Sequence, residues 1–78
     1  MNNERHIIIY SSSECPRCKL VKQMLDKHHV QYEEILDNTQ LMINKGFEAV
    51  PVIEVDDEVI DEYINILTWL EKHNYYSL

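Results

Sequence analysis

The sequence predicts an α/β protein, built as a three-layer α/β/α sandwich around a four-stranded mixed sheet. Three observations support this prediction. Short β-branched runs alternate with amphipathic segments, which gives the element order βαβαββα. A helix between the first two strands implies a parallel pair with a right-handed crossover. The chain has one Gly and two Pro in 78 residues, which is few for an all-β chain rich in tight turns. We expect one domain that spans residues 1–78.

The first half of the chain is predicted to form a strand, a helix and a second strand. Residues 6–10 are a short apolar run without alternation, typical of a strand buried on both faces. Residues 16–28 keep apolar side chains at helical spacing and have a proline in the first turn, which predicts an amphipathic helix. Residues 30–36 open with alternating polarity and predict a half-exposed strand.

The second half is predicted to form a short helix, a hairpin and a last helix. Residues 41–45 predict the short helix, which ends at Gly46 in the left-handed conformation. Residues 50–55 and 58–60 predict two strands joined by an Asp-Asp turn. Residues 61–73 predict the last helix, and the tail after it is expected to fray. A β-α-β half joined by a helix to a β-β-α half is the arrangement of the thioredoxin-like fold.

The acidic composition limits the range of partners. The formal net charge is −7 at pH 7, so the chain is a poor fit to nucleic-acid phosphates and to anionic membrane surfaces. A partner with a basic surface is the natural electrostatic complement. Residues 1–6 lack a signal-peptide pattern, and no apolar run approaches the roughly 18 residues that span a membrane. We therefore expect a cytoplasmic protein, in which a structural disulfide is disfavoured.

The motif C-P-R-C at residues 15–18 lies between the predicted buried strand and the start of the first helix. A thiolate at a helix N-terminus faces unpaired backbone N–H groups and the positive end of the helix dipole. Such surroundings lower a thiol pKa from about 8.5 into the range of roughly 3.5–7.5. Nearby basic side chains act in the same direction: Arg17, Lys19 and Lys22. We predict that Cys15 is the nucleophile and that Cys18, one turn deeper, attacks the resulting mixed disulfide.

A metal site at the same two cysteines is the alternative interpretation. Zinc would need two more ligands, and the candidates are four histidines without the usual ligand spacing: His6, His28, His29 and His73. The related possibility is an iron–sulfur cluster held between two subunits. The strand–C-x-x-C–helix context favours redox chemistry, so we assign no metal ligand.

Three segments resemble the glutaredoxin family. Residues 10–18 are similar to the active-site stretch of glutaredoxins, and residues 32–35 resemble the strand that follows it there. Residues 46–52 are similar to a Gly-Phe…Pro-Val segment of the related redoxins that reduce ribonucleotide reductase. The match extends over about residues 6–70. It implies a single glutaredoxin-like domain that works as a disulfide reductase.

The resemblance also implies a substrate-binding surface around the thiols. Pro51 is implied to be a cis-proline that faces them, although only about 5–6% of X–Pro bonds are cis in general. The backbone of Val50 is implied to offer β-type hydrogen bonds to a bound peptide or to glutathione. Pro16 and Arg17, inside the motif, complete the implied binding set.

The resemblance implies a thiol donor and no tightly bound cofactor. The donor is expected to be reduced glutathione or a flavin-dependent thioredoxin reductase. The substrate is expected to be a disulfide-containing protein such as ribonucleotide reductase. We expect a monomer that binds neither nucleic acid nor membranes.

The chain departs from the glutathione-using members at several positions. Those members carry a basic residue where this chain has Ser12, and a tyrosine where it has Arg17. After the fourth strand they carry two glycines, whereas this chain has Asp61 and Glu62. Acidic side chains there repel the carboxylates of glutathione. We therefore predict that glutathione is a poorer donor than thioredoxin reductase.

Overall fold

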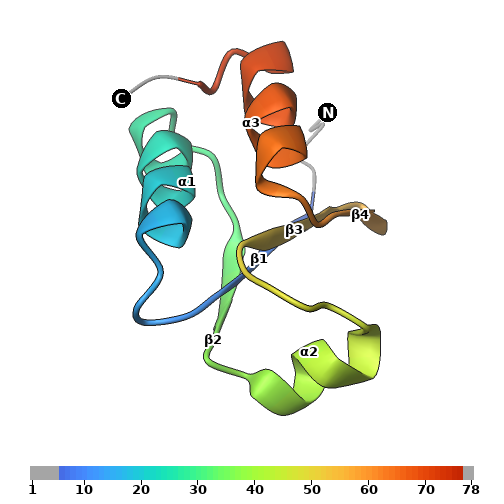
Figure 1. Cartoon of the computed structure of the whole chain (residues 1–78). Coiled ribbons are helices and arrows are strands. Elements are labelled where there is room, and N and C mark those ends of the chain that lie inside the picture. Colours follow the sequence, from blue (N-terminus) through green and yellow to red (C-terminus); the bar gives the residue numbers. More distant parts are fainter. Residues whose placement is uncertain (1–5, 77–78) are drawn as a thin grey trace.

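The computed structural model describes residues 6–76 (Figure 1). In chain order the elements are β1 (Ile7–Ser11), α1 (Pro16–Lys27), β2 (Glu33–Leu36), α2 (Thr39–Lys45), β3 (Val52–Val55), β4 (Glu58–Ile60) and α3 (Tyr63–Lys72). The predicted order βαβαββα is confirmed. The last part of the tail, Ser77 and Leu78, lies outside the described residues.

The four strands form one mixed sheet in the order β2-β1-β3-β4. Strands β1 and β2 are parallel, while β3 pairs antiparallel with both β1 and β4. The register pairs Ser11 with Leu36 and Tyr10 with Val52, and it pairs Ile53 with Ile60. The last residues of β1, β2 and β4 and the first residue of β3 therefore lie at one end of the sheet. We call it the thiol end, because the segment that leads to Cys15 leaves from it.

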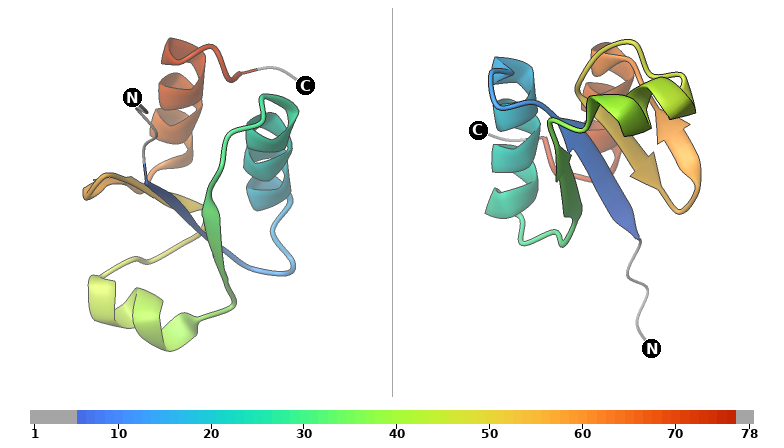
Figure 2. Two further views of the ribbon diagram at one scale, coloured as in Figure 1. Left: turned by 180° about the vertical axis from the view of Figure 1, so that it is seen from behind. Right: turned by 90° about the horizontal axis from the view of Figure 1, so that it is seen from below.

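The helices make the outer two layers of the sandwich. Helices α1 and α3 cover one face of the sheet and α2 lies on the other (Figures 1 and 2). The main hydrophobic core lies under α1 and α3, and its most buried side chains are Ile9, Val21, Leu25, Ile53, Ile66 and Leu70. These come from β1, α1, β3 and α3, so burial of apolar surface between the two helices and the central strands stabilises the fold.

The face covered by α2 is thinner and more polar. Helix α2 has no buried residue. It is held by its ends, because the Asn38 side chain accepts a hydrogen bond from the Leu41 N–H and Gly46 closes the helix at φ +80°. Beneath it Tyr10 is buried and packs edge-to-face against Phe47, with ring centroids 5.0 Å apart.

Several predicted boundaries shift by one to three residues: the short helix, for example, starts at Thr39 and not at residue 41. Three of the shifts have a clear physical reason. The second strand starts at Glu33 and not at residue 30, because His29 (φ +58°) and Val30, whose N–H binds the Leu25 carbonyl, close α1. The third strand starts at Val52, directly after a proline that has no N–H for the sheet. The last helix starts at Tyr63, because residue 62 is its extended N-cap.

Two further features complete the fold. Asp56 and Asp57 form the predicted turn between β3 and β4, with φ +49° and +78°. Such positive values suit the tight two-residue turns of β-hairpins, and Asp tolerates them better than most residues. Within residues 6–76, no helix combines the length and the apolar character that crossing a membrane requires.

Candidate active site

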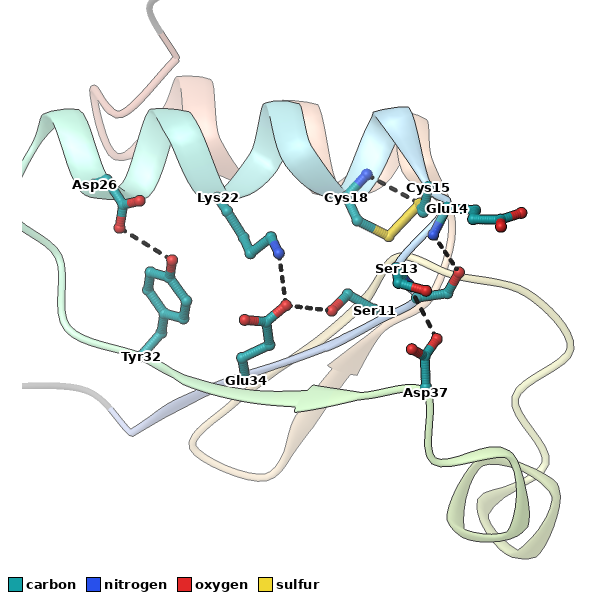
Figure 3. A network of polar contacts seen from close by, with 11 residues as sticks. Ser11, Ser13, Glu14, Cys15, Cys18, Lys22, Asp26, Tyr32, Glu34 and Asp37 are labelled. Carbon is teal, nitrogen blue, oxygen red and sulfur yellow. Dashed lines mark hydrogen bonds and ion pairs between the residues drawn. A yellow bond between two sulfur atoms is a disulfide. The ribbon is translucent and has the colours of Figure 1, made fainter.

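Cys15 and Cys18 are joined by a disulfide at the start of α1, with their Cα atoms 5.2 Å apart (Figure 3). Cys15 is the N-cap of the helix and has an extended backbone (φ −124°, ψ 100°). Its sulfur accepts a hydrogen bond of 3.0 Å from the Cys18 N–H. Pro16 occupies the first helical position, where a missing N–H has no cost. The Cys15 sulfur thus occupies the place that a capping side-chain oxygen takes in other helices.

The two sulfur positions differ in exposure. Cys15 is 8% exposed, whereas Cys18 is fully enclosed at 0%. An incoming disulfide can therefore reach Cys15 first. The first turn of α1 contains no acidic side chain, so the positive end of the helix dipole is not offset within the helix. Glu14, just before the motif, is exposed, and its side chain points away from the disulfide (Figure 3).

The loop before Cys15 is fastened to the end of β2. The Asp37 carboxylate accepts a hydrogen bond from the Ser13 N–H (3.0 Å), and the Asp37 N–H donates to the Ser11 carbonyl (2.9 Å). Within the loop, the Glu14 N–H donates to the Ser12 hydroxyl (3.3 Å). Asp37 therefore positions the approach to the thiols. Sequence analysis missed it, since its role depends on the pairing of β1 with β2.

A polar network lies beside α1, one turn beyond Cys18 (Figure 3). Lys22 Nζ lies 2.6 Å from Glu34 Oε2, and the Ser11 hydroxyl donates to the same oxygen at 2.6 Å. The hydrogen bond from Lys22, and secondarily that from Ser11, lower the pKa of the Glu34 carboxyl. Lys22 was expected to help lower the thiol pKa. The structure pairs Lys22 with Glu34, so Lys22 is directed at that carboxylate, and its effect on the thiol stays a prediction.

Arg17 lies on the other flank of the helix start. Its guanidinium carbon is 4.8 Å from the ring centroid of Tyr63, the first residue of α3. Cation–π contacts of this kind hold a guanidinium in place while leaving its N–H groups free to bind a ligand. Tyr63 lies within the predicted last helix, and the packing of α3 beside α1 brings it to the site.

The proline implied to face the thiols lies at the thiol end of the sheet. The Val50–Pro51 peptide bond is cis, as the resemblance implied. Pro51 is buried and Val50 half-buried, directly before β3. Asp61 and Glu62 are exposed at the same end, where β4 runs into α3. All of the implied binding positions thus gather around one end of the sheet.

The surroundings of the two sulfurs offer few donors for a metal. Within the part of the chain that the structure describes, no group of three or more His, Cys, Asp or Glu side chains is placed to hold a metal ion. His28 and His73 follow the far ends of α1 and α3, and both rings lie near Tyr75, at 5.8 and 6.0 Å between centroids. His6 precedes β1, also away from the thiol end.

Comparison with known proteins gives a consistent result. Residues 7–60 match the Glutaredoxin family model. The chain is 38% identical over 56 residues to Glutaredoxin-like protein NrdH of Lactococcus lactis, which covers 65% of this chain and 78% of that protein. Among solved structures, Glutaredoxin 1 from Francisella tularensis superposes with a TM-score of 0.70 at 20% identity, covering 94% of this chain and 99% of the other. A thioredoxin-like protein superposes with a TM-score of 0.65 at 28% identity, covering 82% and 97%.

Proposed function

The chain belongs to the glutaredoxin family and is a thiol–disulfide oxidoreductase, and from this premise we propose that Cys15 is its nucleophile and Cys18 its resolving thiol. The observation that carries this assignment is the hydrogen bond from the Cys18 N–H to the Cys15 sulfur at the N-cap of α1. In the reduced protein the same N–H and the helix dipole favour a thiolate at Cys15 over a neutral thiol.

The reaction proceeds by two thiol–disulfide exchanges. The Cys15 thiolate attacks one sulfur of the substrate disulfide, forms a mixed disulfide and releases the other substrate sulfur as a thiolate, which takes up a proton. Cys18 then loses its proton and attacks the Cys15 sulfur. This step closes the Cys15–Cys18 disulfide and releases the second substrate thiol. Two electrons pass from the protein dithiol to the substrate, and a thiol donor returns them.

Two serine variants test these roles. Cys15→Ser should abolish disulfide reduction, whereas Cys18→Ser should accumulate a mixed disulfide through Cys15. Mass spectrometry of each variant after mixing with a disulfide substrate shows which sulfur carries the adduct. An adduct on Cys18 in the Cys15→Ser protein, formed as fast as the adduct on Cys15 in the Cys18→Ser protein, would reverse the assignment.

The electron donor that we propose is a flavin-dependent thioredoxin reductase, and the substrate is a protein disulfide such as that of ribonucleotide reductase. The proposal is supported by Ser12, Asp61 and Glu62, which replace the basic residue and the two glycines expected of a glutathione site. Asp61 and Glu62 are exposed at the thiol end, where they would face the carboxylates of glutathione. We propose that the protein acts in the cytoplasm as a monomer and needs no bound cofactor.

A further inference from the structure

Basic residues are concentrated on α1. The whole chain has seven Lys and Arg against 14 Asp and Glu. Helix α1 alone carries four of the seven, and its single acidic residue is Asp26. An acidic protein therefore presents a cationic helix at the place where its redox pair begins.

A groove of about 350 Å³ runs along this helix, between α1 and β2. Its lining consists of Lys19, Lys22, Gln23 and Asp26 from the helix, with Tyr32 and Glu34 from the β2 side. Figure 3 shows several of these side chains facing one another across it. We call it the α1–β2 groove.

The α1–β2 groove begins one helical turn from the nucleophile. The Lys19 N–H donates to the Cys15 carbonyl at 3.2 Å, the first turn of α1. Residues four apart lie on the same face of a helix, about 6 Å apart along its axis. Lys19 therefore follows Cys15 on the flank that borders the groove, whereas Arg17 is turned to the opposite flank by its contact with Tyr63. A peptide attached to Cys15 would meet Lys19 within one or two residues.

Some charged groups of the groove already have a partner within the described part of the chain, and one does not. Lys22 is paired with Glu34, and Asp26 accepts a hydrogen bond from the Tyr32 hydroxyl at 3.0 Å. Lys19 is exposed and has no ion-pair partner among residues 6–76. Its ammonium is thus available to an external carboxylate.

We propose that the α1–β2 groove binds an acidic peptide segment that flanks the cysteine of the protein substrate, with Lys19 contacting its carboxylates. The proposal rests on the proposed function, because it describes the substrate of the same thiol–disulfide exchange. Exposed acidic side chains precede the motif and lie where β4 runs into α3: Glu14, Asp61 and Glu62, while Arg17 on the opposite flank is held against Tyr63. Repulsion from these acidic side chains therefore favours an acidic substrate segment that lies along α1. The net charge of −7 favours a basic partner for the molecule as a whole. In the groove, however, Lys22 and Glu34 offset each other and Asp26 is bound by Tyr32, so the ammonium of Lys19 favours an acidic segment there.

Two synthetic peptides test the proposal. Each carries one cysteine in a mixed disulfide with 2-mercaptoethanol, and they differ only in the two residues on either side, which are Asp and Glu in one and Asn and Gln in the other. The reduced protein is mixed with each peptide at about 0.15 M salt, where charges more than about 8 Å apart are largely screened. The quantity compared is the ratio of the two rate constants, since the reactivity of Cys15 enters both and cancels.

The wild-type protein should reduce the acidic peptide about two- to fivefold faster, the effect of an exposed ion pair. Lys19→Gln should bring the ratio to about one. Lys72→Gln makes the same charge change in the last turn of α3 and, as the matched control, should keep the wild-type ratio. Glu34→Gln should raise the ratio, because it releases Lys22 into the groove.

A wild-type ratio of one or less would overturn the assignment, as would equal ratios for Lys19→Gln and Lys72→Gln. A small neutral disulfide, bis(2-hydroxyethyl) disulfide, separates this inference from the function on which it rests. If the protein reduces it without preferring the acidic peptide, only the groove assignment is refuted. If the protein reduces neither this compound nor either peptide, the proposed function is refuted as well.

Discussion

Tyr10 donates a hydrogen bond of 2.5 Å to Glu54, joining neighbouring strands on the face of the sheet that α2 covers. The same carboxylate is 3.1 Å from Lys45, the last residue of α2. The hydrogen bond from Tyr10 is the main cause that lowers the pKa of Glu54, and it outweighs the opposing effect of burial. This three-residue contact ties a helix without buried residues to the sheet beneath it.

Tyr10→Phe should lower the free energy of unfolding at pH 7 by about 1.5–3 kcal/mol, because it removes a hydrogen bond to a charged acceptor. The folded-state pKa of Glu54 is lowered, so its stabilising contribution is present above its unfolded pKa of about 4.3. That contribution is lost as the pH falls through the folded value. The difference between wild type and variant should therefore shrink in acid, which urea unfolding at pH 7 and at about pH 3 would measure.

Tyr32→Phe is the matched control for that measurement. It also removes a phenol hydroxyl that donates to a carboxylate, but the bond to Asp26 lies at the surface, in the α1–β2 groove. Its loss should change the free energy of unfolding by less than about 1 kcal/mol. Equal losses in the two variants would contradict the role given to the contact under α2.

The Cys15 thiol should titrate below the value of about 8.5 for a free cysteine. The helix terminus, through the Cys18 N–H, is the main cause that we expect, and Arg17 is a secondary one. Thiolate absorbance followed against pH in the reduced Cys18→Ser protein measures it. A midpoint near or above 8.5 would show that the N-cap position leaves the thiol unperturbed.

Thioredoxin reductase should support turnover better than glutathione does. We expect glutathione to lack a basic partner at Ser12 and to meet acids at residues 61 and 62. The loss of one charge-assisted hydrogen bond, on the order of 1.5–3 kcal/mol, weakens binding roughly ten- to a hundredfold. NADPH oxidation coupled to each donor system in parallel gives the two values of kcat/KM.

A triple variant extends the comparison of donors. Ser12→Lys with Asp61→Gly and Glu62→Gly should raise the glutathione-dependent rate. The matched control is Asp56→Gly with Asp57→Gly, which removes two acids at positive-φ positions in the β3–β4 turn, away from the thiol end. An unchanged rate in the triple variant, or an equal rise in the control, would mean that these side chains do not limit the use of glutathione.

Protein purified under reducing conditions should contain no stoichiometric zinc or iron. Zinc sites use four ligands, and the two sulfurs lack a second pair with usable spacing. Elemental analysis of the reduced protein decides the question. About one metal ion per chain, or one cluster per two chains, would favour the metal-binding alternative.

Much of the architecture could be predicted from local signals. The proline at the first position of α1 and the left-handed Gly46 both mark helix ends where the structure has them. The Asp-Asp turn of the hairpin was equally recognisable. Such signals depend on a few neighbouring residues, so they survive without knowledge of the tertiary structure.

The side-chain partners at the site could not be predicted in the same way. The pairing of Lys22 with Glu34 depends on the packing of α1 against β2 across a separation of 12 residues. The contact of Arg17 with Tyr63 depends on the placement of α3 beside α1. Neither arrangement leaves a local pattern in the sequence. The spacing of basic residues along α1 was visible, but which of them is free for a ligand was not.

The position of the thiols at one end of the sheet has a practical consequence. The described chain begins and finishes at the opposite end: the His6 N–H binds Asp56 in the hairpin turn, and Tyr75 follows the far end of α3 beside His28. An affinity tag, a surface linker or a second protein that is fused before His6 or after Tyr76 should therefore leave Cys15 accessible to substrate.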